Sequence, residues 1–197
     1  MKINSINSGA FEQLKTNIQF MPSKSSSKVI MIASGERGEG RSTTAAYLSI
    51  ELASSGEKTL LIDSDIKNPD IHNIFKLAND KGLLDVLYGE TKYEQAVKPT
   101  QQEHLFVLTS GKKSLNYAKL FSSGKFNCFI QSLKERFDYI IIDTPCVNTG
   151  VETQVISQDV DGCVFVVKSG QTERKSAQKA KDILQDNNVN IIGVFLN

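Results

Sequence analysis

The feature that most constrains this chain is a glycine-rich loop between an apolar run and a helix-forming segment. The apolar run is Lys28–Ala33, and the helical segment begins at Ser42. Glycines let successive backbone N–H groups turn toward one point, and the following helix presents its positive N-terminal end there. The order strand, loop, helix is the context that a phosphate-binding loop requires. The predicted loop is Gly35-Glu36-Arg37-Gly38-Glu39-Gly40-Arg41-Ser42-Thr43.

Strand-like and helix-like segments alternate along the rest of the chain. The strand-like runs are apolar without alternation, which is typical of strands buried on both faces. We therefore predict an α/β fold with a mostly parallel sheet and helices on both faces. The expected strands are 28–33, 59–62, 105–108, 139–142, 162–167 and 190–196, and the expected helices are 42–55, 83–88, 126–136, 172–186 and one that includes Phe11, Leu14 and Ile18.

Carboxylates follow two of the expected strands. Asp63 and Asp65 come after strand 59–62, and Asp143 comes after strand 139–142. Ligand sites of open α/β sheets gather at the carboxyl ends of the strands. One of these carboxylates could accept a proton from an attacking hydroxyl, and the others could hold Mg²⁺ or its waters. Each signal is weak alone, but together with the phosphate loop they form a specific combination.

Arg41 stands at the position where a phosphate loop usually has lysine. Lysine is a compact point charge that reaches the β- and γ-phosphates, whereas arginine is a planar fork with a bulkier head. Arg41 can bind a phosphate, but its planar head is less suited to staying with the negative charge of a phosphoryl group during transfer. The loop therefore supports nucleotide binding more strongly than catalysis. Within the same loop, Ser42 is placed to ligate Mg²⁺, and Thr43 can reach a phosphate.

Composition narrows the class of protein further. The 197 residues suit one domain, and 23 basic against 22 acidic residues give a net charge of +1, which argues against a nucleic-acid partner. Three cysteines without paired spacing argue against a disulfide framework. Apolar runs fall well short of the ~20 residues of a membrane span, and the N-terminus lacks a secretory signal. We expect a soluble protein of the reducing cytosol.

The motifs, taken in order, resemble the bacterial tyrosine kinases of capsule and exopolysaccharide synthesis. The resemblance runs from about Phe11 to Asn197 and rests on GERGEGRST, LLIDSDIKNP, GLLDVLYGE, VLTSGK, FDYIIIDTP and IIGVFLN. It implies a P-loop fold, ATP with Mg²⁺, and phosphorylation of tyrosine-containing proteins. It also implies a membrane-embedded chain-length regulator whose cytoplasmic tail activates the kinase and holds it at the inner face of the membrane.

The resemblance assigns roles to the matching positions. Gly35–Thr43 match the Walker A loop, Asp63 and Asp65 match a second Walker motif particular to this family, and Asp143 matches Walker B. Asp63 is then the expected base on the tyrosine hydroxyl, while Ser42, Asp65 and Asp143 are the expected holders of Mg²⁺. Arg41 takes the place of the phosphate-clamping lysine. Asn197 matches the asparagine after the last strand that contacts adenine.

Several positions depart from the family pattern besides Arg41. Residues 1–27 form an expected N-terminal helix and linker, a candidate oligomerisation segment ahead of the kinase-like domain at 28–197. The family's Glu-x-x-Arg-x-x-Arg motif falls there on Gly9, Glu12 and Lys15, so a homo-oligomer built through it is an open question. Lys119 and Cys146 replace a glutamate and a proline, and the five tyrosines are scattered.

Two alternatives stay open from the sequence. One is a nucleotide-binding pseudokinase that regulates polysaccharide assembly without transferring phosphate, suggested by Arg41 and the absence of a tyrosine cluster. The other is an ATPase of the MinD/ParA type, which shares the fold. Those ATPases carry a second lysine early in Walker A, where this chain has Gly35-Glu36-Arg37.

Overall fold

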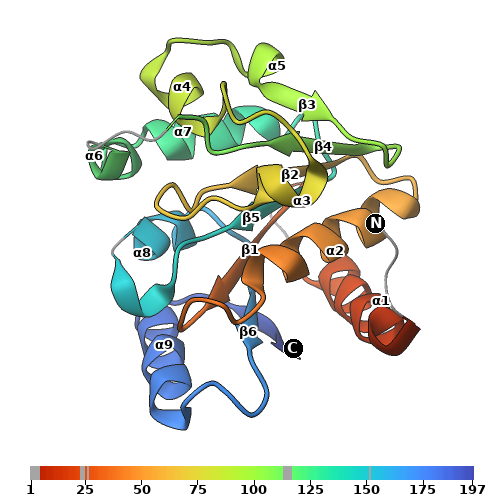
Figure 1. Ribbon diagram of the computed structural model, residues 1–197, viewed down its shortest axis with the longest axis vertical. Coiled ribbons are helices and arrows are strands. Elements are labelled where there is room, and N and C mark those ends of the chain that lie inside the picture. The colour runs from red at the N-terminus through yellow and green to blue at the C-terminus, as the bar shows by residue number, and fades with distance from the viewer. Residues whose placement is uncertain (1–4, 23–24, 26, 113–116, 151) are drawn as a thin grey trace.

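The computed structural model describes residues 5–22, 25, 27–112, 117–150 and 152–197, which form one seven-stranded sheet with helices on both faces (Figure 1). The strand order is β3-β4-β2-β5-β1-β6-β7; only the β3–β4 pair is antiparallel within these ranges. The predicted α/β class with a mostly parallel sheet is confirmed. The strands are β1 Lys28–Ser34, β2 Thr59–Asp63, β3 Val97–Pro99, β4 Leu105–Leu108, β5 Tyr139–Asp143, β6 Gly162–Val167 and β7 Ile191–Leu196.

The three central strands explain why their sequences show no alternation. In β1, the five residues Val29–Ala33 are all 0% exposed, because helices cover both faces of the sheet. β5 lies between β1 and β2, and the register places Asp63 directly opposite Asp143. Ser64, the residue after β2, further joins the ends of β2 and β5, since its hydroxyl donates to the Asp143 carbonyl at 2.6 Å. Parallel pairing thus brings the ends of three strands to one point.

Helices divide between the two faces of the sheet. On one face, α1, α2 and α3 share an apolar cluster with residues such as Ile30 and Ile141. On the other face, α4, α6, α7, α8 and α9 cover residues such as Met31 and Ile140. The helices are α1 Ser5–Phe20, α2 Arg41–Ser54, α3 Ile71–Phe75, α4 Leu83–Tyr88, α5 Tyr93–Ala96, α6 Tyr117–Ser122, α7 Lys125–Leu133, α8 Glu152–Ser157 and α9 Arg174–Asp186, with a 3₁₀ turn at Val147–Thr149.

The expected long elements are present with small shifts at their ends. The helix predicted over 126–136 spans Lys125–Leu133, and the helix predicted over 172–186 begins at Arg174. The elements missing from the prediction are short: α3, α5, β3, α6 and α8 have three to six residues each. Segments of this length are too short for apolar periodicity to be recognised.

Helix α1 belongs to the core of the domain. Phe11, Leu14 and Ile18 are buried, and the Phe11 ring lies 4.8 Å from the Phe195 ring. The Lys15 ammonium is 2.9 Å from a Glu51 carboxylate oxygen on α2 and 3.0 Å from the Ser55 hydroxyl. Lys15 therefore makes its contacts within the chain. The division of the chain at residue 27, and α1 as an oligomerisation segment, stay predictions.

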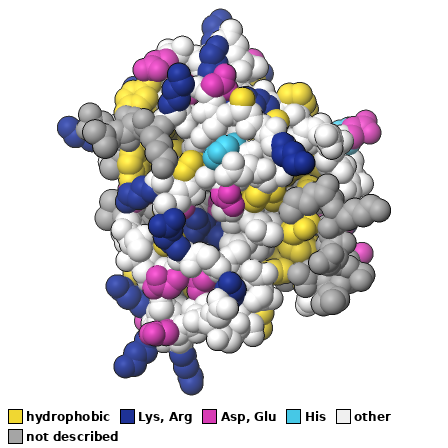
Figure 2. Space-filling model, in the orientation of Figure 1, with side chains coloured by type: hydrophobic (Ala, Val, Ile, Leu, Met, Phe, Trp, Pro, Cys, Tyr) yellow, Lys and Arg dark blue, Asp and Glu magenta, His cyan; other side chains and the backbone are white. Residues whose placement is uncertain are grey.

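The described helices do not include one that could cross a bilayer; each is too short or too polar. On the face in Figure 2, Lys and Arg side chains are interspersed with Asp and Glu.

Replacing Phe11 with alanine tests the contribution of α1. Phe11 is 1% exposed and contacts aromatic rings of α2 and β7, so Phe11→Ala should cost about 3–5 kcal/mol in the free energy of unfolding. Phe20 on the same helix is 84% exposed, so Phe20→Ala should cost less than about 0.5 kcal/mol. Urea unfolding measures both, and similar costs would contradict the packing of α1 described here.

Candidate functional site

The glycine-rich loop joins β1 to α2, as predicted, and its shape depends on Gly40. Gly40 has φ +91°, a left-handed conformation, and a Cβ there would overlap the Asn197 side chain. Asn197 Nδ2 donates to the Glu39 carbonyl at 3.1 Å. Asn197, predicted to contact adenine, thus contacts the loop itself in this structure. The last strand and the loop are held in close contact.

Two glutamates of the loop are tied to the start of α9. The Glu39 carboxylate accepts from the Glu36 backbone N–H at 2.9 Å and from the Thr172 hydroxyl. The Glu36 carboxylate accepts from the Ser176 hydroxyl, and Asn148 is bonded to Ser176. These acidic side chains are therefore turned toward α9. Both were predicted as cofactor-binding residues of the loop. Their partners Thr172 and Ser176 were not predicted, because they lie more than 100 residues away.

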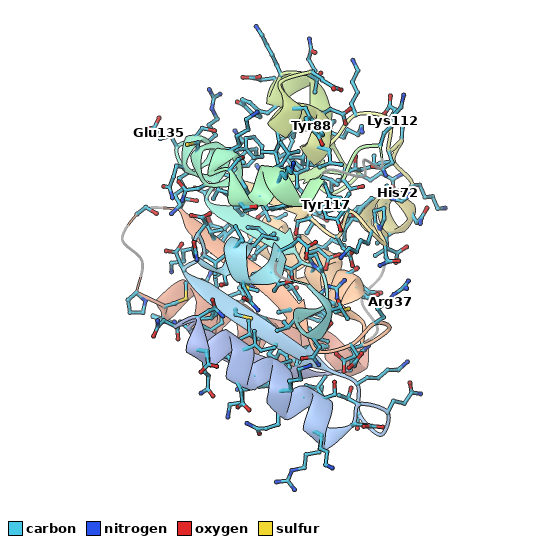
Figure 3. All side chains as sticks on the ribbon, turned by 90° about the vertical axis from the view of Figure 1, so that its left-hand side faces the viewer. Arg37, His72, Tyr88, Lys112, Tyr117 and Glu135 are labelled. Atoms are coloured by element: carbon cyan, nitrogen blue, oxygen red, sulfur yellow. The ribbon has the colours of Figure 1, made fainter. Side chains whose placement is uncertain are left out.

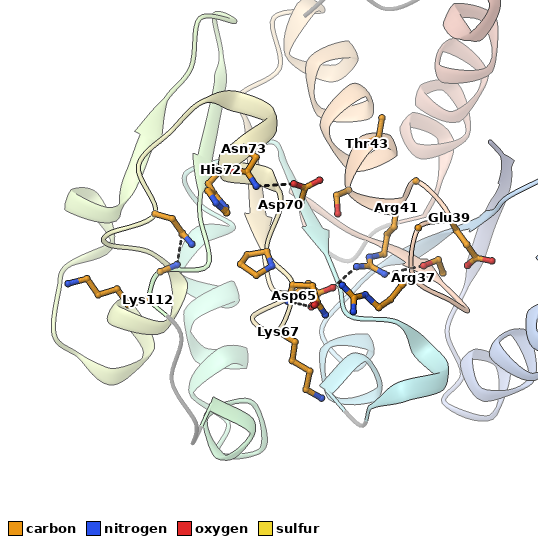
Figure 4. A pocket seen from close by; sticks show the side chains of 18 residues that line it. Arg37, Glu39, Arg41, Thr43, Asp65, Lys67, Asp70, His72, Asn73 and Lys112 are labelled. Carbon is orange, nitrogen blue, oxygen red and sulfur yellow. Dashed lines mark hydrogen bonds and ion pairs between the residues drawn. The ribbon is translucent and has the colours of Figure 1, made fainter.

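A cavity of about 790 Å³ opens beside the loop. Figure 4 shows its two walls: the phosphate loop on one side, and the segment after β2 with Lys112 on the other. Arg37, His72 and Lys112, which line the cavity, lie along the same side of the molecule in Figure 3. Gly38–Thr43 and Asp65 line it as well. Its volume is within the range of small-molecule sites.

Arg41 occupies the centre of the predicted site and is buried. Its Nη2 is 2.7 Å from Asp65 Oδ2, and its Nε is 2.9 Å from Asp143 Oδ1. Its Nη1 lies 3.1 Å from Ser34 Oγ and 3.5 Å from Cys146 Sγ. The structure therefore brings together Arg41, Asp65 and Asp143, as predicted. Ser34 and Cys146 were not predicted as partners; the departure of Cys146 from the family pattern was the available signal.

Asp63 is fully buried and is not among the residues that line the cavity. Its Oδ1 accepts from the Asp65 N–H, and its Oδ2 accepts from the N–H groups of Asp70 and Ile71, all at 3.2 Å. These bonds shape the turn that leads from β2 into α3. Asp63 does not touch the cavity in this conformation, whereas Asp65 lines it. Asp63 therefore affects the cavity indirectly, through the turn that its hydrogen bonds hold in place.

Burial shifts the titration of these groups. The pKa of Asp63 is raised well above its ordinary value by burial and by the negative charges of Asp143 and Asp65. Burial also raises the pKa of Asp143, although Arg41 and the neighbouring Ser42 oppose that rise. Burial lowers the pKa of Arg41, but Asp143 and Asp65 outweigh it, so the net direction is upward. Arg41 is therefore cationic at any ordinary pH.

The donor set beside the loop suits a hard divalent cation. Asp143 Oδ2 is buried and has no hydrogen-bond partner among the described residues, and Ser42 lies beside this carboxyl. Hydroxyl and carboxylate oxygens are the ligands that Mg²⁺ prefers. An unsatisfied buried carboxylate oxygen is costly unless a ligand or water completes it. The residues present therefore fit a metal ion carried by a nucleotide.

The wall opposite the loop carries a second charge pair. Lys67 Nζ lies 3.4 Å from Glu152 Oε1 and 5.8 Å from the Tyr117 ring centroid. Lys67 is half exposed at the cavity, so its ammonium faces both solvent and Glu152. Neither Lys67 as a residue of this wall nor its pairing with Glu152 was predicted from the sequence.

Comparisons with known proteins place this geometry in a family. Residues 25–197 match the ParA family model, described as NUBPL iron-transfer P-loop NTPase. Tyrosine-protein kinase YwqD of Bacillus subtilis is 38% identical over 98% of this chain and 81% of its own. The chain belongs to the bacterial tyrosine-kinase family. Tyrosine-protein kinase CpsD of Streptococcus agalactiae is 37% identical over 95% of the chain and 81% of its own length.

Solved structures agree with this assignment. The chimerical protein CapA2B2 superposes with a TM-score of 0.91 at 35% identity, covering 96% of this chain and 84% of that one. MinD of Pyrococcus horikoshii, determined with Mg-ADP, superposes less closely, with a TM-score of 0.75 at 27% identity over 87% of this chain and 70% of that one. The P-loop fold is thus shared with both groups. Glu36, tied to Ser176, lies in the stretch where the MinD type has its second lysine.

Gly40→Ala tests the dependence of the loop on Gly40. Gly40 and Gly56 have similar positive φ angles, +91° and +88°, but only Gly40 lies against another side chain. Gly56→Ala should cost about 1–2 kcal/mol in the free energy of unfolding from the backbone alone. Gly40→Ala should cost roughly 1 kcal/mol or more beyond that, because Asn197 has to move. Urea unfolding measures the cost of each variant, and equal costs would contradict the close approach of Gly40 to the Asn197 side chain.

Proposed function

We propose that this protein is an ATP-dependent protein tyrosine kinase that regulates capsular or extracellular polysaccharide synthesis. The observation that carries the proposal is that the phosphate loop and Asp65 line one cavity, while the buried Asp143, at the end of β5, is joined to them through Arg41. The names of its relatives supply the class of reaction. In this proposal the cavity holds ATP, and a tyrosine of a protein substrate enters from the Lys112 side.

Each part of the site has a task in this proposal. The backbone N–H groups of Gly35–Thr43 and the N-terminus of α2 bind the phosphates. Ser42, Asp65 and Asp143 would hold Mg²⁺, and the ion would neutralise charge on the phosphate oxygens. Four of the five N–H bonds of Arg41 point at acceptors in the described chain, two of them at Asp65 and Asp143. When Mg²⁺ takes these two carboxylates, the guanidinium would be released and could donate to a phosphate.

Asp63 is the proposed base for the tyrosine hydroxyl. Its raised pKa suits proton acceptance, but both of its oxygens already accept backbone N–H groups. This role therefore requires the Asp65–Ile71 segment to open when substrate enters. Of the predicted site carboxylates Asp63, Asp65 and Asp143, Asp65 is the one that lines the cavity.

A pseudokinase is the second candidate, and one specific observation favours it. The Arg41 guanidinium is engaged by Asp65 at 2.7 Å and by Asp143 at 2.9 Å. An arginine held in this way supplies little mobile charge to a phosphoryl group in transfer. Such a protein would bind nucleotide and respond to it without transferring phosphate.

The proposed partner is a membrane-embedded polysaccharide chain-length regulator whose cytoplasmic segment activates the kinase. This partner would place the protein in the cytoplasm, at the inner face of the membrane. Tyrosine-containing proteins are the proposed substrates, and copies of this chain could serve as substrates for one another in a homo-oligomer. The relation to the chimerical protein CapA2B2 and to the tyrosine kinases supports this proposal.

The first test measures binding and transfer on the same sample. Calorimetry with ATP or ADP and Mg²⁺ gives binding, and labelled ATP with a tyrosine-rich peptide and the regulator's cytoplasmic segment gives transfer. Asp143→Asn removes a charge but keeps the shape, so transfer should fall by at least ~100-fold. Asp186→Asn, at the exposed end of α9, should leave transfer unchanged. Binding without transfer in the unaltered protein would favour the pseudokinase.

Asp63→Asn distinguishes the role of Asp63, at the end of β2, from the role of Asp65 in the loop that follows. If Asp63 is the base, the variant should still bind ATP while transfer falls at least ~100-fold. Retained transfer would assign the base role elsewhere and leave Asp63 as the organiser of the turn.

Arg41→Lys tests whether the arginine limits the reaction. A lysine side chain is mobile and reaches the β- and γ-phosphates, so the transfer rate should rise at least ~10-fold. An unchanged or lower rate would mean that Arg41 does not limit turnover.

A further inference from the structure

We propose that Arg41 is a built-in counter-ion that holds the nucleotide site together before nucleotide binds and competes with a divalent cation for Asp65 and Asp143. The inference rests on the proposed function only for the identity of the nucleotide. Its consequence is that the unaltered protein depends little on Mg²⁺ for the stability of this site.

The contacts of Arg41 join α2 to three other segments of the chain. Ser34 ends β1, Asp143 ends β5, and Asp65 and Cys146 lie in the loops after β2 and β5. The Arg41 side chain is 9% exposed, and the facing side chains of Asp65 and Asp143 are 4% and 0% exposed. One buried guanidinium therefore connects the first turn of α2 to the ends of β1 and β5 and to the loop after β2.

The charges show why the site needs this connection. Two buried carboxylates beside each other repel, and a third, Asp63, lies directly across from Asp143. Leaving a buried charge without its partner is strongly destabilising. Arg41 offsets one of these charges and donates to both Asp65 and Asp143 at once. A lysine ammonium is a single point charge and cannot span them with the same planar fork.

The same contacts bring the guanidinium and a divalent cation into competition. Asp65 Oδ2 and Asp143 Oδ1 face Arg41, and Asp65 Oδ1 accepts the Asn68 N–H at 3.1 Å. This leaves Asp143 Oδ2 as the oxygen of this pair without a partner in the described chain. Consistently, no group of three or more His, Cys, Asp or Glu side chains in the described ranges could hold a metal by itself. A divalent cation that takes both carboxylates has to displace Arg41.

Thermal unfolding of the nucleotide-free protein tests the proposal. The midpoint of the unaltered protein should be the same with EDTA as with millimolar MgCl₂. Arg41→Met removes the charge, so its midpoint in EDTA should fall by roughly 10 °C. Millimolar MgCl₂ should recover about half of that loss, because the cation then occupies the released carboxylates. A purely structural role would lower the midpoint without creating a response to Mg²⁺.

Two further variants complete the test. Arg41→Lys keeps the charge and should fold even if Arg41→Met does not; it should show a smaller loss and a response to MgCl₂. Arg136→Met, an exposed arginine that lies over the Tyr93 ring, is the matched control and should show neither effect. The proposal is overturned if neither Arg41 variant responds to MgCl₂, or if the unaltered protein responds as strongly. No nucleotide or phosphoryl transfer is involved, so an inactive protein that shows these responses would refute the proposed function alone.

Discussion

The whole site depends on the parallel pairing of β2, β5 and β1. Parallel strands end at the same edge of the sheet, so this pairing places Asp63 opposite Asp143 and both beside the loop that follows β1. Because helices cover both faces, the strand interiors are entirely apolar, and polar groups collect where the strands end. The concentration of charge at this edge is therefore a direct result of the topology.

Electrostatics then decides which conformation this edge can adopt. Three carboxylates in a region shielded from water are unfavourable, and the loop residue Arg41 supplies the compensating charge from the first turn of α2. Ser34 and Cys146 complete the surroundings of the guanidinium. Arg41 and Cys146, two positions that differ from the family pattern, are thus in contact with each other.

Much of this could be predicted from sequence, and the remainder has a physical cause. Long apolar runs and the glycine-rich loop are local patterns, so the sequence predicted the parallel strands and the loop, and it placed Arg41, Asp65 and Asp143 as neighbours. The short antiparallel strand β3 was not predicted. The direction of the Arg41 side chain could not be predicted, because it depends on contacts with segments that are distant in the sequence. Similarly, Asp63 was expected at the cavity but does not line it. Its carboxylate is held by the backbone N–H groups of Asp70 and Ile71, seven and eight residues later, and no spacing rule in the sequence predicts these bonds.

The attachment of the phosphate loop to α9 has a mechanical consequence. Glu36 and Glu39 are bonded to Ser176 and Thr172, and Asn148 reinforces the first of these attachments. These hydrogen bonds fix the position of the loop relative to the beginning of α9. Moving the first turn of α9 would break these hydrogen bonds or shift the loop with it, so the shape of the loop depends on a helix that contributes none of the described residues lining the cavity.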